Sequence, residues 1–271
     1  MNAIKAISVF ACLAIFSVSL SSVVLAEDLI SVETEYGGKL RFLLLKPDNP
    51  VAAVVLFAGG NGYLGLTDSG ELRGQKGSFL IKNREILADQ GFMVAAIDAP
   101  SGVKDLRRTY RMSEKHGQDI AAVVQELKKK ANVPVWLIGH SRGTYSAANG
   151  AIRLRELVDG LILTSTVTKA REKYASYKTH PNGVMSMELG SIKAPVLIVA
   201  NKTDSCGSTP ASNAKKLVKA FTGTPTAAVK IFAGENEPKQ DNCKWKAQHQ
   251  FYGFQENAVS FIAEFIKANA K

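Results

Sequence analysis

Residues 133–154 read VPVWLIGHSRGTYSAANGAIRL and determine which fold the rest of the chain can adopt. The opening run, VPVWLIG (133–139), is almost wholly apolar, as in a strand buried on both faces of a sheet. The pattern G-x-S-x-G follows at 139–143, and a stretch with helical periodicity comes directly after it. A strand, a tight turn and a helix around this pattern would lift the Ser141 hydroxyl above the sheet edge. The Arg142 N–H would point into the same space.

Further apolar runs repeat the strand signal on both sides of this stretch. They occupy 51–58, 93–99, 158–165, 194–200 and 227–233, and a hairpin is expected from 29–36 and 39–45 around Gly37-Gly38. Stretches with helical periodicity lie between the runs, near 79–90, 115–131, 142–155, 210–221 and 255–269. Strands that alternate with helices predict an α/β fold with a mostly parallel central sheet covered on both faces. Since no linker rich in Pro, Gly or Ser interrupts residues 27–271, we expect a single domain.

The composition is that of a globular protein and excludes disordered, collagen-like and coiled-coil chains, with 46% hydrophobic and 21% charged residues among 271. Lysine and arginine outnumber aspartate and glutamate by 34 to 24, which gives a net charge of +10 and favours anionic surfaces or substrates. Three cysteines, four histidines and two tryptophans offer little material for a metal cluster or a nucleic-acid platform. We expect no metal, no cofactor and no nucleic-acid partner.

The first 26 residues have the marks of a secretory signal peptide. A single charge, Lys5, precedes an apolar stretch that ends in Val24-Leu25-Ala26. An uncleaved membrane anchor is the alternative, because the apolar stretch is long enough to cross a bilayer. We expect cleavage and export to the periplasm or the medium, with no membrane span afterwards.

Cleavage would remove Cys12 and leave two cysteines, Cys206 and Cys243. An even number of cysteines in an exported chain predicts a disulfide. A bridge between them closes residues 206–243 into a loop and contributes about 4 kcal/mol in the chain-entropy model. Two unpaired buried cysteines are the alternative.

A second glycine motif, GNGYLG (60–65), matches the dinucleotide-binding pattern G-x-G-x-x-G. That pattern binds pyrophosphate only where the strand turns at once into a helix. The next residues, LTDSGELRGQKGS (66–78), contain three more glycines and show no helical periodicity, so we reject a nucleotide site.

Taken together, the G-x-S-x-G turn and the order of the strands resemble the α/β-hydrolase superfamily over nearly all of residues 29–271. In that family an acidic residue follows the second strand after the nucleophile strand, and a histidine follows the last strand. Here Asp204 follows APVLIVA (194–200), and His249 follows AAVKIFA (227–233). The resemblance therefore implies a catalytic triad of Ser141, Asp204 and His249, in the family's chain order.

The resemblance also implies an oxyanion hole formed by two backbone N–H groups. One belongs to Arg142 and the other to Gly60, with Asn61 as the neighbouring alternative. The glycines at 60–65 then let the backbone approach an oxyanion. A bridge between Cys206 and Cys243 would tie the Asp204 loop to the His249 loop and help to preorganise the triad.

Several other polar residues have weaker claims to a catalytic role. Asp241 is a fallback for the acid but lies on the histidine loop, and Asp98 is more readily explained as structural. We expect His140 to pack inside the turn, and the spacings of His116 and His180 make no recognisable metal site.

The chain is thus expected to be an exported serine hydrolase, most readily an esterase acting on small or accessible acyl groups. Thioester or amide hydrolysis and acyl transfer use the same machinery and stay open. The connection 166–193 is too short for a large cap domain. The size of the protein and this short connection resemble those of dienelactone hydrolases, although those have Cys where this chain has Ser141. A non-catalytic binding protein on the same fold is the alternative.

One basic cluster, with Arg107, Arg108 and Arg111 beside Tyr110, follows the strand expected at 93–99. A solvated surface is the ordinary interpretation of such a cluster. The alternative is that these arginines line the mouth of the pocket and favour acidic substrates, since they lie on the active-site side of the sheet.

Overall fold

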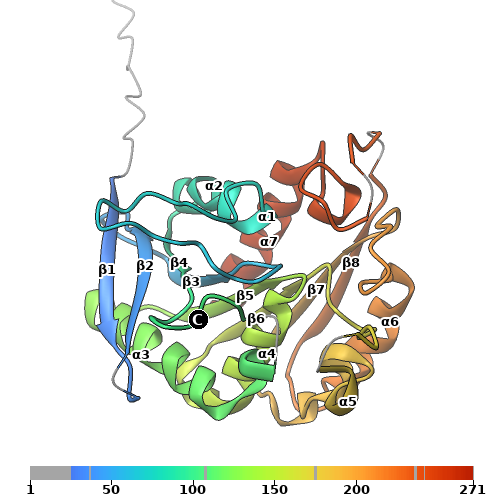
Figure 1. The fold of residues 1–271 in the computed structure, drawn as a ribbon, viewed down its shortest axis with the longest axis horizontal. Coiled ribbons are helices and arrows are strands. Elements are labelled where there is room, and N and C mark those ends of the chain that lie inside the picture. The colour runs from blue at the N-terminus through green and yellow to red at the C-terminus, as the bar shows by residue number, and fades with distance from the viewer. Residues whose placement is uncertain are drawn as a thin grey trace, which may run out of the picture.

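An eight-stranded sheet forms the centre of the protein (Figure 1), for which a computed structural model describes residues 26–36, 38–106, 109–173, 176–234, 237–240 and 242–270. The strand order is β1-β2-β4-β3-β5-β6-β7-β8. The strands span Glu27–Glu33 (β1), Lys39–Leu45 (β2), Ala52–Phe57 (β3), Phe92–Ile97 (β4), Val135–His140 (β5), Gly160–Thr164 (β6), Val196–Asn201 (β7) and Ala227–Phe232 (β8). The bounds of each strand lie within three residues of those of the apolar run or hairpin segment that predicts it. The expected signal peptide lies outside the described residues apart from Ala26, and so does Gly37 of the hairpin turn.

The sheet is parallel except at one edge. β1 pairs with β2 and β2 with β4 in antiparallel fashion, whereas all pairs from β4 to β8 are parallel. Parallel strands carry their carboxyl ends to one edge of the sheet. The loops that follow β3, β4, β5, β7 and β8 therefore meet at that edge, where ligand sites of open α/β sheets form.

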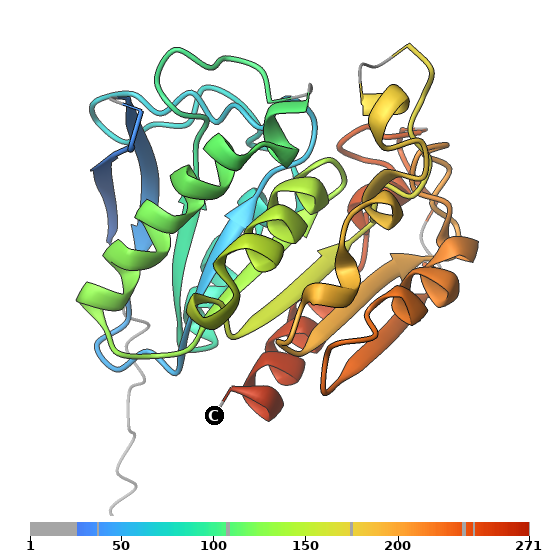
Figure 2. The same cartoon turned by 90° about the horizontal axis from the view of Figure 1, so that it is seen from below.

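Helices cover both faces of the sheet, which explains why its parallel strands have continuous apolar sequences. Figure 2 shows the face on which α3 (Glu114–Lys130) and α4 (Gly143–Leu154) pack, and α6 (Ala214–Leu217) joins the same core. The other face packs against α1 (Phe79–Lys82), α2 (Arg84–Asp89) and α7 (Gln255–Asn269). The chain therefore has the mostly parallel, doubly covered sheet that the sequence predicts.

Two of the expected helices are interrupted. The stretch predicted at 79–90 divides into α1 and α2 at Asn83, whose side-chain Nδ2 donates to the carbonyl of Phe79 at 2.6 Å and takes up an acceptor of the helix. The stretch predicted at 210–221 consists of η5 (Ala211–Asn213), α6 and η6 (Val218–Ala220).

The connection between β6 and β7 contains only short helical pieces in its described part. These are α5 (Ser176–Thr179), η3 (Gly183–Ser186) and η4 (Leu189–Ser191), so no large cap forms among the described residues of this connection. Three more short helices are η1 (Thr109–Met112), η2 (Arg155–Leu157) and η7 (Gln248–Gln250). Throughout the described ranges, no helix combines the length and the apolarity that crossing a bilayer requires.

The first residue of β6, Gly160, leaves space for the fully buried ring of Trp136 on the neighbouring strand. A Cβ atom at Gly160 would lie 2.1 Å from Cε3 of that ring, so an alanine would force the ring or the strand to shift. We predict that Gly160→Ala lowers the free energy of unfolding by about 1–3 kcal/mol, as overpacked cores do. Urea unfolding measures this loss of stability. Gly207→Ala is the control, because its Cβ would meet only Arg171 Nη2, at 3.9 Å. Equal midpoints for both variants would contradict this packing.

Candidate active site

The turn between β5 and α4 holds Ser141 in a backbone conformation that side chains rarely adopt. Its φ angle is +53°, in the left-handed region, which costs a non-glycine residue on the order of 1–3 kcal/mol. Hydrogen bonds on both sides fix the conformation. The Ser141 N–H donates to the Thr164 carbonyl at 3.0 Å, and the Ser141 carbonyl accepts from the Thr144 N–H at 3.0 Å and from Thr144 Oγ1 at 2.6 Å. Strained residues that their surroundings hold this firmly are concentrated at functional sites.

Close packing around the turn accounts for the glycine after the serine. A Cβ atom at Gly143 would lie 2.0 Å from the carbonyl oxygen of Phe57, the last residue of β3. The loop that follows β3 also passes the serine closely, since a Cβ at Gly59 would lie 3.0 Å from Ser141 Cβ. Gly59 therefore brings the backbone of this loop against Ser141, a contact that the sequence pattern did not indicate.

Asp204 and His249 meet beside this turn, although 45 positions separate them in the sequence. Asp204 follows β7, His249 lies in η7, and His249 Nδ1 is 2.9 Å from Asp204 Oδ2, with both side chains only 1% exposed. A carboxylate can only accept, so Nδ1 carries the proton and Nε2 is left as the basic nitrogen. The arrangement is that of an imidazole oriented by a carboxylate.

Three further groups hold this pair in place, and the sequence analysis identified none of these contacts. The Thr209 hydroxyl donates to Asp204 Oδ2 at 2.7 Å and lies 3.2 Å from His249 Nδ1. The Cys206 N–H donates to Asp204 Oδ1 at 2.8 Å. On the histidine side, the Ser165 hydroxyl donates to the His249 carbonyl at 2.9 Å. The orientation of the imidazole is thus fixed through both its ring and its backbone.

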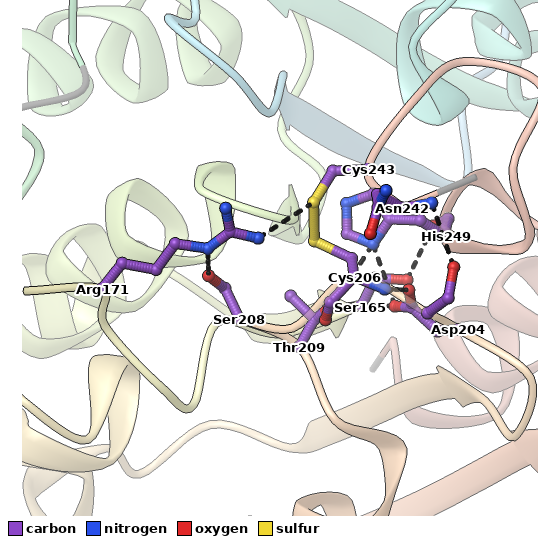
Figure 3. The surroundings of a disulfide bond; sticks show 10 residues. Ser165, Arg171, Asp204, Cys206, Ser208, Thr209, Asn242, Cys243 and His249 are labelled. Carbon is purple, nitrogen blue, oxygen red and sulfur yellow. Dashed lines mark hydrogen bonds and ion pairs between the residues drawn. A yellow bond between two sulfur atoms is a disulfide. The ribbon is translucent and has the colours of Figure 1, made fainter. Parts of the chain in front are cut away.

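The cysteines form a disulfide that joins the two loops, as Figure 3 shows. Cys206 follows Asp204 by two positions, Cys243 precedes His249 by six, and their Cα atoms are 4.9 Å apart. Arg171 lies against the bridge, with Nε donating to Ser208 Oγ at 3.2 Å. The pairing is the one that the cysteine count predicts.

A cavity of about 290 Å³ lies in front of these residues. Ser141, Arg142, Gly60 and His249 all line it, while Asp204 lies behind His249. Asn61, the alternative to Gly60, does not line it. The other lining residues are Gly59, Gln75, Ser78, Arg111, Tyr145, Val167, Ala170, Arg171, Ser176, Cys206, Ser208, Cys243, Trp245 and Gln250.

Asp98 shapes the loop that carries Gly60. Its Oδ1 accepts hydrogen bonds from the N–H groups of Leu64 (2.7 Å), Gly65 (3.2 Å) and Ala99 (2.7 Å), and its Oδ2 accepts from the Leu66 N–H at 2.9 Å. The carboxylate thus binds three consecutive N–H groups of this loop, those of residues 64–66, which supports the structural role expected of Asp98. Residues 59–78 contain no helix, so the context that a dinucleotide site needs is absent from this described segment.

Two other histidines are buried and do not face the cavity. His140 Nδ1 is 3.0 Å from Thr164 Oγ1, and its ring centroid lies 5.0 Å from that of His249. Burial, and next the charge that His249 could carry, hold the pKa of His140 well below the usual range, so His140 stays neutral near pH 7. Burial likewise lowers the pKa of His116.

His116 belongs to a second group of serine, histidine and aspartate, which the sequence analysis did not identify. His116 Nε2 is 2.9 Å from Ser146 Oγ, and Nδ1 is 3.6 Å from Asp119 Oδ2. Ser146 is fully buried, so no substrate can reach it, and the second distance is too long for a hydrogen bond. This group is therefore part of the interior and not a second active site.

Arg111 also departs from the ordinary interpretation of the basic cluster. It is 2% exposed and lines the cavity, so a solvated position is wrong for this residue. Arg107 and Arg108 of the same cluster lie outside the described residues, as does Asp241, the fallback for the acid.

Among the described residues, one group of potential metal ligands lies at this site, and its atoms already take part in other bonds. Oxygen, sulfur and nitrogen atoms of Asp204, Cys206 and His249 lie within 4.8 Å of one another. The sulfur is part of the disulfide, and the carboxylate and the imidazole bind each other. This donor set fits a serine hydrolase and does not fit a metal, which needs free ligands.

The sequence matches the family described as "Serine aminopeptidase, S33" over residues 82–222, about half of the chain. No curated protein sequence matches it. Similar solved structures include the esterase Pf2001 of Pyrococcus furiosus (TM-score 0.62, 15% identity, covering 90% of this chain and 93% of that one). Another is a cold-adapted esterase from an Arctic intertidal metagenomic library (TM-score 0.58, 14% identity, covering 90% of this chain and 94% of that one). A third is dipeptidyl peptidase 4 of Porphyromonas gingivalis (TM-score 0.65, 15% identity, covering 90% of this chain and 36% of that one). At these identities the structural likeness establishes the fold.

The disulfide generates a prediction about stability. Replacing both cysteines, as Cys206→Ser with Cys243→Ser, is expected to lower the free energy of unfolding by about 4 kcal/mol, because the unfolded chain is no longer constrained across this loop. Urea unfolding with and without a reductant measures it. The reductant should shift the midpoint of the wild type and leave that of the double variant unchanged. A wild-type midpoint that does not respond to the reductant would contradict a bridged chain.

Proposed function

Because this chain belongs to the serine aminopeptidase S33 family of α/β hydrolases, we propose that it hydrolyses carboxylic esters through Ser141, His249 and Asp204. The observation that carries the proposal is the oriented pair of Asp204 and His249, whose imidazole lines the same cavity as the strained Ser141. The family match covers Ser141 and Asp204 and ends before His249, so the assignment of the histidine rests on the geometry and on its place after the last strand.

In the proposed reaction, Ser141 Oγ attacks the carbonyl carbon of the ester while its proton passes to His249 Nε2. Asp204 stabilises the imidazolium that results. The negative charge that develops on the carbonyl oxygen is met by the backbone N–H groups of Gly60 and Arg142, each of which contributes about 100- to 1,000-fold in rate. The C–O bond then breaks, and the imidazolium protonates the departing alcohol.

Water completes the cycle. It attacks the acyl group on Ser141 and gives a proton to His249 Nε2, the bond to Ser141 Oγ breaks, and the imidazolium returns the proton to the serine. The products are a carboxylic acid and the regenerated enzyme. The steps need no cofactor, and thioesters or amides would pass through the same intermediates.

An ester substrate has more support than a peptide. The esterase structures match this chain over more than 90% of their own length, whereas the chain spans only 36% of the dipeptidyl peptidase. The described connection between β6 and β7 leaves the cavity without a large cap, which suits an accessible acyl group.

We also propose that the protein acts outside the cytoplasm. The apolar segment that ends at Ala26 and the Cys206–Cys243 disulfide both fit an exported chain, because such bridges persist in oxidising compartments.

The proposal predicts how substitutions act on hydrolysis of a phenyl ester of a short-chain acid. Ser141→Ala should lower kcat by at least about 10⁴-fold, since it removes the nucleophile. Asp204→Asn should lower kcat by about 10³- to 10⁴-fold, because the amide no longer holds the imidazole in the productive tautomer. Stopped assays of released phenol measure both.

Ser31→Ala, on the exposed edge strand β1, is the matched control and should retain wild-type activity. Thermal unfolding of each variant separates loss of chemistry from loss of fold. An Ser141→Ala enzyme that stays within tenfold of the wild type would contradict the assignment. A folded wild type without activity on any ester or amide would favour a binding protein.

A further inference from the structure

The charge of the catalytic cavity is strongly one-sided. Three arginines line it, Arg111, Arg142 and Arg171, and no aspartate or glutamate occurs among its described lining residues. A cavity lined by one sign of charge focuses its field on the ligand. The positive field therefore acts on the substrate itself and favours an anionic one.

Arg111 is the most buried of the three. Its Nη1 donates to Ser146 Oγ at 2.8 Å, its Nη2 donates to the Ala58 carbonyl at 3.0 Å, and its Nε has no partner in the described structure. Both acceptors are neutral. Burial, and next the charge of Arg142, lower its pKa to about 9 against the pull of Asp105, so the side chain remains a cation at neutral pH.

The side chain of Arg111 cannot easily turn away, because a buried network holds it. Ser146 Oγ contacts His116 Nε2 at 2.9 Å, and the Tyr110 hydroxyl donates to Asp119 Oδ2 at 2.6 Å beside that histidine. Such a network resembles the support that preorganised binding sites give to the groups that touch the ligand. The buried group of Ser146, His116 and Asp119 thus holds Arg111 in place, although it takes no part in catalysis.

The strand order places Arg111 on one side of Ser141, whereas Arg171 follows β6 and lies beside the disulfide on the other side. Arg111 follows β4, its acceptor Ala58 follows β3, and both strands lie on one side of β5 in the sheet. Asp204 and His249 follow β7 and β8, on the other side. The imidazole protonates the leaving group, so the leaving group occupies the histidine side. The acyl group then extends toward Arg111 and Arg142.

We propose that Arg111 and Arg142 form a subsite for a carboxylate at the far end of the acyl group, so that the preferred substrates are half-esters of short dicarboxylic acids. This inference rests on the proposed esterase function. The cavity volume of about 290 Å³ is at the small end of ligand pockets and suits a short acyl chain.

A matched pair of esters tests the subsite. Phenyl hydrogen glutarate carries the carboxylate, and its methyl ester at the far carboxyl group is the neutral counterpart. We expect the wild type to have a kcat/KM about 10-fold or more higher for the half-ester, the ratio typical of a hydrogen bond to a charged group. In Arg142→Gln this ratio should fall toward one, while the backbone N–H of residue 142 is retained. Arg111→Gln should act in the same direction, and Arg111→Lys should keep part of the preference.

Lys129→Gln is the charge control. It changes the net charge of the protein by the same amount as Arg142→Gln, but Lys129 lies on α3 and does not line the cavity. It should leave the ratio unchanged. A wild-type ratio near one would overturn the subsite, and so would an equal loss for both esters in Arg142→Gln, since that result shows a general effect on the oxyanion. A fall in the ratio with Lys129→Gln equal to that with Arg142→Gln would overturn it as well.

Labelling with a neutral fluorophosphonate separates this proposal from the esterase function. If the wild type is labelled at Ser141 but does not prefer the half-ester, or cleaves neither ester, Ser141 is an activated serine and the carboxylate subsite is overturned. If the wild type is not labelled, both the esterase function and the subsite are overturned. Protection of Ser141 from the label by free glutarate, weaker in Arg142→Gln than in the wild type, would support the subsite independently of turnover.

Discussion

The close approach of β3, Ser141 and α4 is the constraint on which the site depends. A left-handed residue between a strand and a helix has to be stabilised from outside, and here Thr164 on β6 and Thr144 on α4 supply the hydrogen bonds. The helix can start at once only because Gly143 lets it pass the carbonyl of Phe57. Backbone packing therefore fixes the direction in which the Ser141 side chain leaves the turn.

Everything else at the site is arranged around that fixed point by the strand order. β7 and β8 bring the acid and the imidazole from one side, and the disulfide joins their two loops. β3 and β4 bring the Gly60 loop and Arg111 from the other side. The carboxylate of Asp98 shapes the Gly60 loop, and the Arg111 guanidinium binds the Ala58 carbonyl that precedes it. In the proposed mechanism, proton transfer and recognition of the acyl group therefore lie on opposite sides of Ser141.

Most of the fold could be predicted from the sequence because its strands are continuous apolar runs of strand length. The turn at Ser141 was recognisable since its glycines reflect a local steric demand, and the resemblance to the α/β-hydrolase superfamily pointed to Asp204 and His249. What the sequence could not indicate depends on groups far apart along the chain. The break at Asn83 is accompanied by a side-chain bond to Phe79, and the contact of Thr209 with Asp204 depends on the course of a loop. The burial of Arg111 depends on acceptors from the loop after β3 and from α4. None of these leaves a pattern in the residues around it.

The central claim is that Ser141 is a nucleophile activated by His249. The most direct measurement is reaction of residues 27–271, with the disulfide oxidised, with a neutral fluorophosphonate, followed by peptide mass spectrometry to locate the adduct. The account predicts one adduct per chain on Ser141, absent from Ser141→Ala and at least about 100-fold slower to form in His249→Ala. An adduct on another serine, or labelling of His249→Ala at the wild-type rate, would contradict it.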